Sequence, residues 1–262
     1  MNRLRILTIV ATLLFFGGIC RAEQKENHIW NRETLTDGFF GLNKILADSG
    51  IEVGFGVTSI YQQNVRGGIS KHRRAGRITG SYDMEISADF QKLLGFESGT
   101  LFLHLEGGWP DAEGIDGVSV GSAFGVNADA IGNDAILVKQ LYYEGLILND
   151  NLTLMIGKID FTGVFDASDY ADCECTQFLN GAFVDNPTIP FPQYSLGLVL
   201  TYAMTDTWYV MAGMADVQAD SRETGFRTTF GDEDYFFYAL ETGVTSRLNS
   251  ANGPMSGRYR AG

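Results

Sequence analysis

The sequence has little proline, little cysteine and few basic residues, and each shortage excludes a class of protein. It contains 5 Pro and 3 Cys among 262 residues, and so few cysteines cannot form a disulfide framework. Lys and Arg number 19 against 32 Asp and Glu, and so acidic a chain repels nucleic acid. After residue 22 no apolar run approaches the roughly 18 residues of a transmembrane helix. Glycine and aromatic residues are abundant instead, which favours long β-strands.

Residues 1–22 have the three parts of a secretory signal peptide. Arg3 and Arg5 give a basic start, and an apolar run of about 14 residues follows from Ile6. Cys20 to Ala22 supplies a cleavage site, so we expect the mature chain to begin near Glu23. A membrane anchor is the alternative, and a lipid anchor on Cys20 is disfavoured because Ile19 is not small.

The segment 23–50 is expected to contain one short helix. Across residues 36–48 the apolar positions recur at helical spacing, Thr36 or Asp37 is suited to the N-cap, and Gly50 follows as a stop. From Ile51 the hydrophobic period changes from about 3.6 to 2, which indicates a change to β-structure.

About eight strands with alternating faces follow, and a ninth is expected near the C-terminus. The clearest is "SYDMEISADF", residues 81–90, in which apolar and polar side chains alternate without a break. The same pattern recurs in "TLFLHLEGGW", "LYYEGLIL", "NLTLMIGKI", "YSLGLVLTY", "TWYVMAGM" and "YFFYALETGV".

Two regularities favour a membrane barrel over a soluble sandwich, which also alternates. Long connections at 62–78, 110–135, 161–193 and 217–233 alternate with short ones near residues 95, 150, 206 and 252. Outer-membrane barrels have long loops at one end and short periplasmic turns at the other. Aromatic residues such as Trp109 and Trp208 also lie at strand ends on the apolar face, as in interfacial girdles. We therefore predict an all-β, antiparallel transmembrane β-barrel over residues 51–262, preceded by a short helix at its periplasmic mouth.

At this point the chain resembles the carbohydrate-selective porins of the OprB type. The resemblance begins in "LTDGFFGLNKILADSGIEVGFG" and continues through "ADFQKLLGFESGTLFLHLEG" and "LYYEGLILNDNLTLMIGKIDFTGVFDASDYA". "YSLGLVLTYAMTDTWYVMAGMAD" extends it, so that it covers most of residues 34–246. It implies an outer-membrane protein of Gram-negative bacteria with roughly sixteen strands. About eight of these are expected here, and the C-terminus lacks the family's final aromatic residue. We interpret the sequence as the N-terminal half of such a porin; a complete eight-stranded barrel is the alternative.

The polar strand faces are the candidate substrate path. If the apolar faces meet lipid, the opposite faces line the lumen, where carboxylates accept hydrogen bonds from sugar hydroxyls and Tyr142 stacks on a sugar face. The predicted lumen residues are Asp83, Glu85, His104, Glu106, Tyr142 and Glu144. His104 and Glu106 share a face, but no third ligand or catalytic partner accompanies them, so we predict no enzyme, metal or cofactor. Because few Lys or Arg residues share these faces, a cation preference is expected.

The longest connection is the candidate constriction loop. It carries Asp166, Asp169 and Tyr170 and a proline-stiffened stretch, "NPTIPFPQY". The alternative is an exposed, mobile loop. Cys173 and Cys175 form a C-x-C pair without a second pair or a nearby His, and we interpret them as incidental.

The leading functional hypothesis is passive diffusion of small neutral saccharides across the outer membrane. The alternatives are a non-conducting barrel that anchors or adheres, and a secreted saccharide-binding β-protein. Other expected partners are outer-membrane lipid and lipopolysaccharide phosphates, which suit the basic segment "RGGISKHRRAGR". The pore is expected to be a monomer or a trimer.

Overall fold

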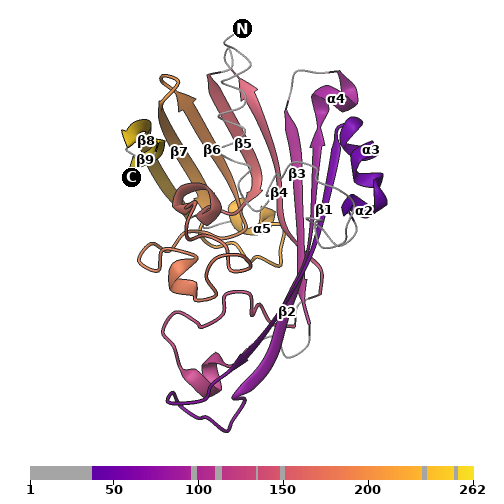
Figure 1. Cartoon of the computed structure of the whole chain (residues 1–262). Helices are drawn as coiled ribbons and strands as arrows, with labels where there is room; N and C mark the ends of the chain where they lie inside the picture. The colour runs from indigo at the N-terminus through magenta and orange to yellow at the C-terminus, as the bar shows by residue number, and fades with distance from the viewer. Residues whose placement is uncertain are drawn as a thin grey trace. The chain divides into compact units, whose positions relative to one another are not determined.

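A computed structural model describes residues 37–95, 99–109, 114–133, 135–147, 151–231, 235–250 and 253–262. The predicted signal peptide and residues 23–36, including the possible cap Thr36, lie outside this part. Nine strands form one antiparallel sheet in the order of the chain, from β1 to β9 (Figure 1). The chain divides into two compact units: residues 1–97, 104–136 and 168–184 form unit 1, and residues 98–103, 137–167 and 185–262 form unit 2.

The strands confirm the predicted alternation of long and short connections. The long ones follow β1, β3, β5 and β7, and the short ones follow β2, β4, β6 and β8. The bounds are β1 Ile51–Gln63, β2 Gly76–Asp89, β3 Thr100–Gly108, β4 Leu137–Ile147, β5 Leu152–Ile159, β6 Ser195–Ala203, β7 Trp208–Asp216, β8 Phe236–Ser250 and β9 Gly253–Ala261.

The expected helix before the first strand is present but broken. It consists of α2 (Asp37–Phe40) and α3 (Leu42–Asp48), because Gly38, Phe39 and Gly41 adopt left-handed backbone angles. The other helical segments among the described residues are short: α4 (Phe90–Leu94), α5 (Phe226–Thr229) and the single turns Asp116–Val120, Thr162–Asp166 and Gly181–Phe183. Among the described residues, no helix is long and apolar enough to cross a membrane.

In unit 1, α3 is fastened to the start of β1. The Asn43 side chain donates to the Val53 carbonyl at 2.7 Å and accepts from the Val53 amide at 3.1 Å. Gly50 joins α3 to β1 with φ of 95°, and a Cβ there would lie 2.7 Å from the Cβ of Lys92. α3 therefore lies beside the short turn that contains α4, at the end of the sheet where the sequence places the periplasmic mouth.

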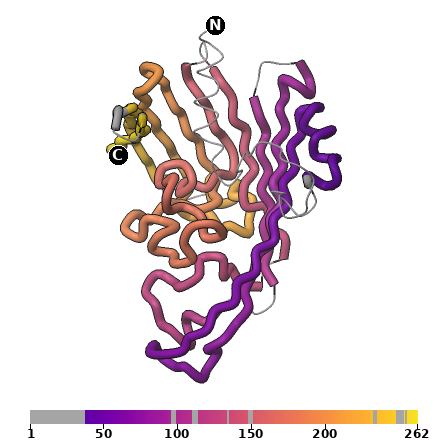
Figure 2. Tube along the Cα trace, viewed as in Figure 1, coloured from indigo at the N-terminus to yellow at the C-terminus, as the bar shows by residue number. Residues whose placement is uncertain are grey.

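Strands β1 and β2 form the long hairpin of unit 1, coloured indigo to purple in Figure 2. Their register runs from Ile51 opposite Ala88 to Gln63 opposite Gly76. It sets Thr58 opposite Ser81 and two glycines, Gly56 and Gly54, opposite Asp83 and Glu85. Since paired residues share a face, the small residues of β1 leave space beside the polar side chains of β2.

In unit 2 the two faces of the sheet differ sharply in exposure. On β5, Met155 is 3% exposed and its neighbour Ile156 is 46% exposed. Val199, Met211 and Ala215 are buried like Met155, whereas the predicted lipid-facing residues Leu101, Trp208 and Leu240 are exposed. The alternation of the strands thus gives one covered face and one face of exposed apolar side chains, as a barrel wall requires.

The covered face of unit 2 is more apolar than the sequence suggested. Phe161 is fully buried and packs with Phe165, their ring centroids 5.6 Å apart. A Cβ on Gly197 or Gly213 would lie 2.7 Å from one of these two rings. The loop after β5 therefore folds back over β6 and β7, where the missing side chains of two glycines make room for its aromatic rings.

The covered face of unit 2 also carries a positively charged residue, Arg260. Arg260 of β9 lies opposite Gly243 and places Nη1 3.7 Å from Oε2 of Glu241, which also accepts a hydrogen bond from Tyr209. Glu241 shares the face of Arg260, because Gly243, the partner of Arg260, lies two residues from Glu241 on β8. The sequence analysis did not place Arg260 on this face, because it gave no bounds for the last strand.

Candidate functional site

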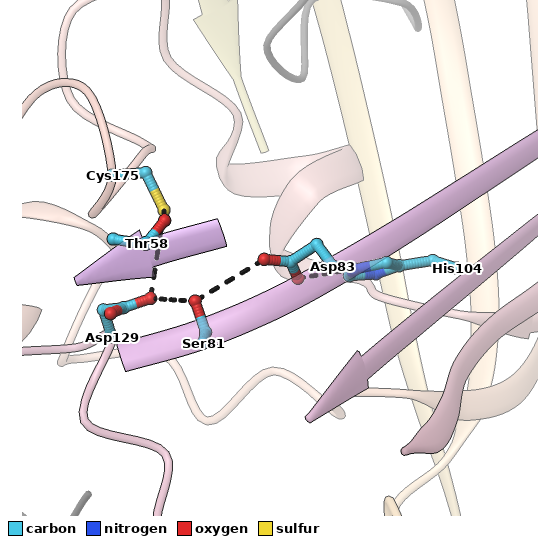
Figure 3. A network of polar contacts seen from close by, with 6 residues as sticks. All are labelled: Thr58, Ser81, Asp83, His104, Asp129 and Cys175. Carbon is cyan, nitrogen blue, oxygen red and sulfur yellow. Dashed lines mark hydrogen bonds and ion pairs between the residues drawn. The ribbon is translucent and has the colours of Figure 1, made fainter. Parts of the chain in front are cut away.

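A chain of polar contacts crosses unit 1 on the face predicted to line the lumen (Figure 3). Ser81 of β2 donates to Oδ1 of Asp129 at 2.6 Å, and it lies 3.5 Å from Oδ2 of Asp83. Asp83 in turn contacts His104 of β3, with 3.1 Å between Oδ1 and Nε2. Two strands and a loop thus contribute to one polar surface.

Four of the predicted lumen residues meet on this surface. Asp83 and Glu85 are two residues apart on β2, and His104 and Glu106 are two residues apart on β3, so each pair shares a face. His104 interacts electrostatically with the other three residues. Glu106 is buried, and Asp83 and His104 are largely covered. The cluster offers several carboxylate acceptors around one imidazole, which suits hydrogen bonding to hydroxyl groups.

The other two predicted lumen residues belong to unit 2, on β4. Tyr142 lies in a tilted pair with Phe102 of β3, the ring centroids 5.1 Å apart and the planes at 35°. Phe102 shares the face of His104 because the two are separated by one residue on β3. Glu144 shares the face of Tyr142 for the same reason. Sequence reasoning found Tyr142 but missed Phe102. In "LFLHL" apolar residues lie on both faces of the strand, so the pattern did not mark Phe102 as a residue of the polar face.

The three constriction-loop candidates belong to two different units. Asp166, in unit 2, accepts a hydrogen bond from the backbone amide of Asn186 and so shapes the loop itself. Asp169 and Tyr170 belong to unit 1, and Tyr170 is 83% exposed. In unit 2, Phe161 and Phe165 of this loop pack onto the sheet, and the sequence analysis left them out. Whether the candidates narrow a pore stays a prediction.

Two loops of unit 1 meet at the end of the polar surface. One carboxylate oxygen of Asp129, one of Glu174 and Sγ of Cys175 all lie within 4.8 Å of one another. Thr58 of β1 donates to Sγ of Cys175 at 3.3 Å, and the Ala128 amide donates to the Leu179 carbonyl at 2.7 Å. The loops after β3 and β5 are therefore held against β1 and β2 at this point.

Burial and neighbouring charges shift the titration of these loop groups. Burial raises the pKa of Asp129, and it raises the pKa of Glu174 to about 7 with a contribution from nearby negative charges. A hydrogen bond from Cys175 lowers the pKa of Cys173 to about 5, while the same contact and burial raise the pKa of Cys175.

Sequence reasoning missed Asp129, Ser81 and Thr58 as members of this surface. Ser81 and Thr58 lie on the polar faces of their strands, so the alternation contained a signal for them. Asp129 lies in an irregular loop, 48 residues after Ser81 in the sequence, and only the folded structure brings the two side chains into contact.

Residues 73–262 match the family described as carbohydrate-selective porin, OprB family. The chain belongs to this family. The structure also resembles that of Pseudomonas putida OprB at high pH, with a TM-score of 0.66 and 16% identity over 87% of this chain and 56% of that one. The low-pH structure of the same protein gives a TM-score of 0.45 with 13% identity over 86% of this chain and 59% of that one. The predicted family and the predicted partial antiparallel barrel are confirmed.

A relative from Aquifex aeolicus (strain VF5), described as an uncharacterized protein, is 36% identical over 88 residues. That match covers 33% of this chain and 28% of the relative. The chain spans about half the length of the P. putida OprB chain that it resembles.

Proposed function

We propose that this OprB-family protein forms an outer-membrane pore through which small neutral saccharides diffuse passively. The observation that carries the proposal is the two-faced sheet, which pairs exposed apolar side chains with a covered face bearing carboxylates, an imidazole and an aromatic pair. Water-filled barrels need an apolar exterior and a polar interior.

The covered face is chemically suited to sugars. In unit 1, Asp83, Glu85 and Glu106 would accept hydrogen bonds from saccharide hydroxyl groups. In unit 2, Phe102 and Tyr142 would contact the apolar face of a saccharide ring. In this proposal these groups bind the sugar without reacting with it, and the protein transports sugars. In this proposal the protein conducts without a cofactor, and lipid and lipopolysaccharide surround the barrel.

The test is conductance and sugar uptake by the full-length protein purified from outer membranes. In planar bilayers we expect stepwise ion conductance, and in liposomes we expect swelling with neutral sugars. A protein that inserts but conducts nothing would indicate an anchoring or adhesive barrel. A protein that stays soluble without detergent and binds saccharides would indicate the secreted alternative.

A further inference from the structure

We propose that Asp129, Glu174 and Cys175 form a binding site for a thiophilic divalent cation such as Zn²⁺. The three residues offer one sulfur and two carboxylate oxygens within 4.8 Å of one another. Zn²⁺ accepts this mixture of ligands and is commonly tetrahedral, with ligand distances of about 2.0–2.3 Å. Small movements of the loop would close the three atoms around one ion.

Asp129 provides an independent indication of a missing ligand. The residue is 2% exposed, and its Oδ1 accepts the hydrogen bond from Ser81 at 2.6 Å. Its Oδ2 is buried without a hydrogen-bond partner among the described residues. A buried carboxylate oxygen without a partner is costly, and a bound cation would satisfy it.

The surroundings hold the proposed ligands in place. Asn127 donates to Thr79 at 2.9 Å and accepts from the Asp129 amide at 3.1 Å, which fixes the backbone on that side. Ser81 orients the Asp129 carboxylate, as outer-shell partners orient metal ligands. On the other side, Thr58 contacts Sγ of Cys175. Cys175 is exposed, so an ion can reach the site from solvent.

A fourth ligand is available in the same loop. Cys173 lies two residues from Cys175 and exchanges a hydrogen bond with it, so its sulfur can complete a tetrahedral site in place of solvent. The sequence alone gave no third ligand for the C-x-C pair, because Asp129 belongs to a different loop. The proposal does not depend on conduction, since the loops of unit 1 would bind the ion whether or not the protein conducts.

The test is Zn²⁺ titration of the full-length, detergent-solubilised protein with its thiols kept reduced. We expect one ion per chain, and Co²⁺ in its place should give a sulfur-to-metal absorption band. Cys175→Ser and Asp129→Asn should each weaken Zn²⁺ binding by about tenfold or more, since even outer-shell changes cost about 10–100-fold. Asp169→Asn, an exposed carboxylate of the same loop, is the matched control and should bind like the wild type.

Three results would overturn the proposal. One is the absence of saturable Zn²⁺ binding by correctly assembled protein with reduced thiols. Another is unchanged affinity in both Cys175→Ser and Asp129→Asn, whose assembly is checked by heat-modifiable migration. The third is a Cys173–Cys175 disulfide in protein isolated without reductant, because oxidised sulfur no longer provides a thiolate ligand.

Discussion

His104 places Nε2 3.1 Å from Oδ1 of Asp83, which joins β3 to β2 on the covered face of unit 1. Asp83→Asn removes one negative charge from the face predicted to line the pore. We therefore predict that Asp83→Asn lowers the cation preference of the pore. One charge at about 4 Å contributes about 1 kcal/mol in water, so the change in the permeability ratio should reach about fivefold at most. The reversal potential in a salt gradient measures it. Asp206→Asn, in the exposed turn between β6 and β7, should leave the reversal potential unchanged, and an equal shift in both variants would contradict the assigned face.

The two faces of the strands should respond differently to charge. Leu240 is 66% exposed on β8, and Leu103 has the same predicted orientation on β3. Leu240→Arg and Leu103→Arg place a charge on the lipid face, which costs about 2–4 kcal/mol near the membrane midplane. Glu85→Gln, on the opposite face, should assemble normally. Heat-modifiable migration on gels reports assembly, and equal tolerance of all three changes would show that the faces are reversed or mixed.

The docking of α3 should depend on Asn43. Asn43→Ala removes both hydrogen bonds to Val53, which together contribute about 1–3 kcal/mol. We expect faster hydrogen exchange in residues 42–48 with the strands unchanged. Lys44→Ala is the control because it removes only an exposed ion pair to Asp48, which contributes little. Unaltered exchange in Asn43→Ala would mean that other contacts hold the helix.

Glu174 should make the loop after β5 sensitive to pH. Its pKa is raised from an ordinary 4.5 to about 7 in the folded loop. As the pH rises, Glu174 therefore loses its proton in the undocked loop before it does so in the docked loop. Docking therefore weakens as the pH rises from about 4.5 to 7, and it stays weaker above 7. Glu174→Gln should be better protected than the wild type from hydrogen exchange at pH 8, and equally protected near pH 4.5. The measurement uses chelator to exclude metal ions, and equal protection at pH 8 would contradict the shift.

The order of strands and loops could be predicted from sequence because apolar and polar residues alternate along each strand. That alternation reflects directly which face meets lipid and which meets the lumen. The position of the short helix followed from the change of period at Ile51, but its break at Gly41 did not, since several residues there adopt left-handed angles. The apolar cover of β6 and β7 was also missed. It depends on Gly197 and Gly213 lying under Phe161 and Phe165, which is a tertiary relationship.

In the candidate site, too, some residues could be predicted from the sequence and others could not. Asp83, Glu85, His104 and Glu106 were predictable because each follows the alternation of its own strand. Asp129, Glu174 and Cys175 were not, because their proximity depends on two irregular loops that meet only in the folded chain. Phe102 was hidden by apolar neighbours on both sides, and Arg260 by the weak pattern of the last strand.

The most direct test of the sugar-pore account is neutral sugar flux through variants at Tyr142, which pairs with Phe102 at 5.1 Å. In liposome-swelling assays, Tyr142→Phe should keep the wild-type rate because it keeps the ring. Tyr142→Ala should lower the rate by about two- to tenfold, the equivalent of the roughly 0.5–1.5 kcal/mol of an aromatic contact. Its ion conductance should not fall, because the smaller side chain leaves the path at least as wide. A Tyr142→Ala pore that passes sugars as fast as Tyr142→Phe would contradict a sugar path along this face.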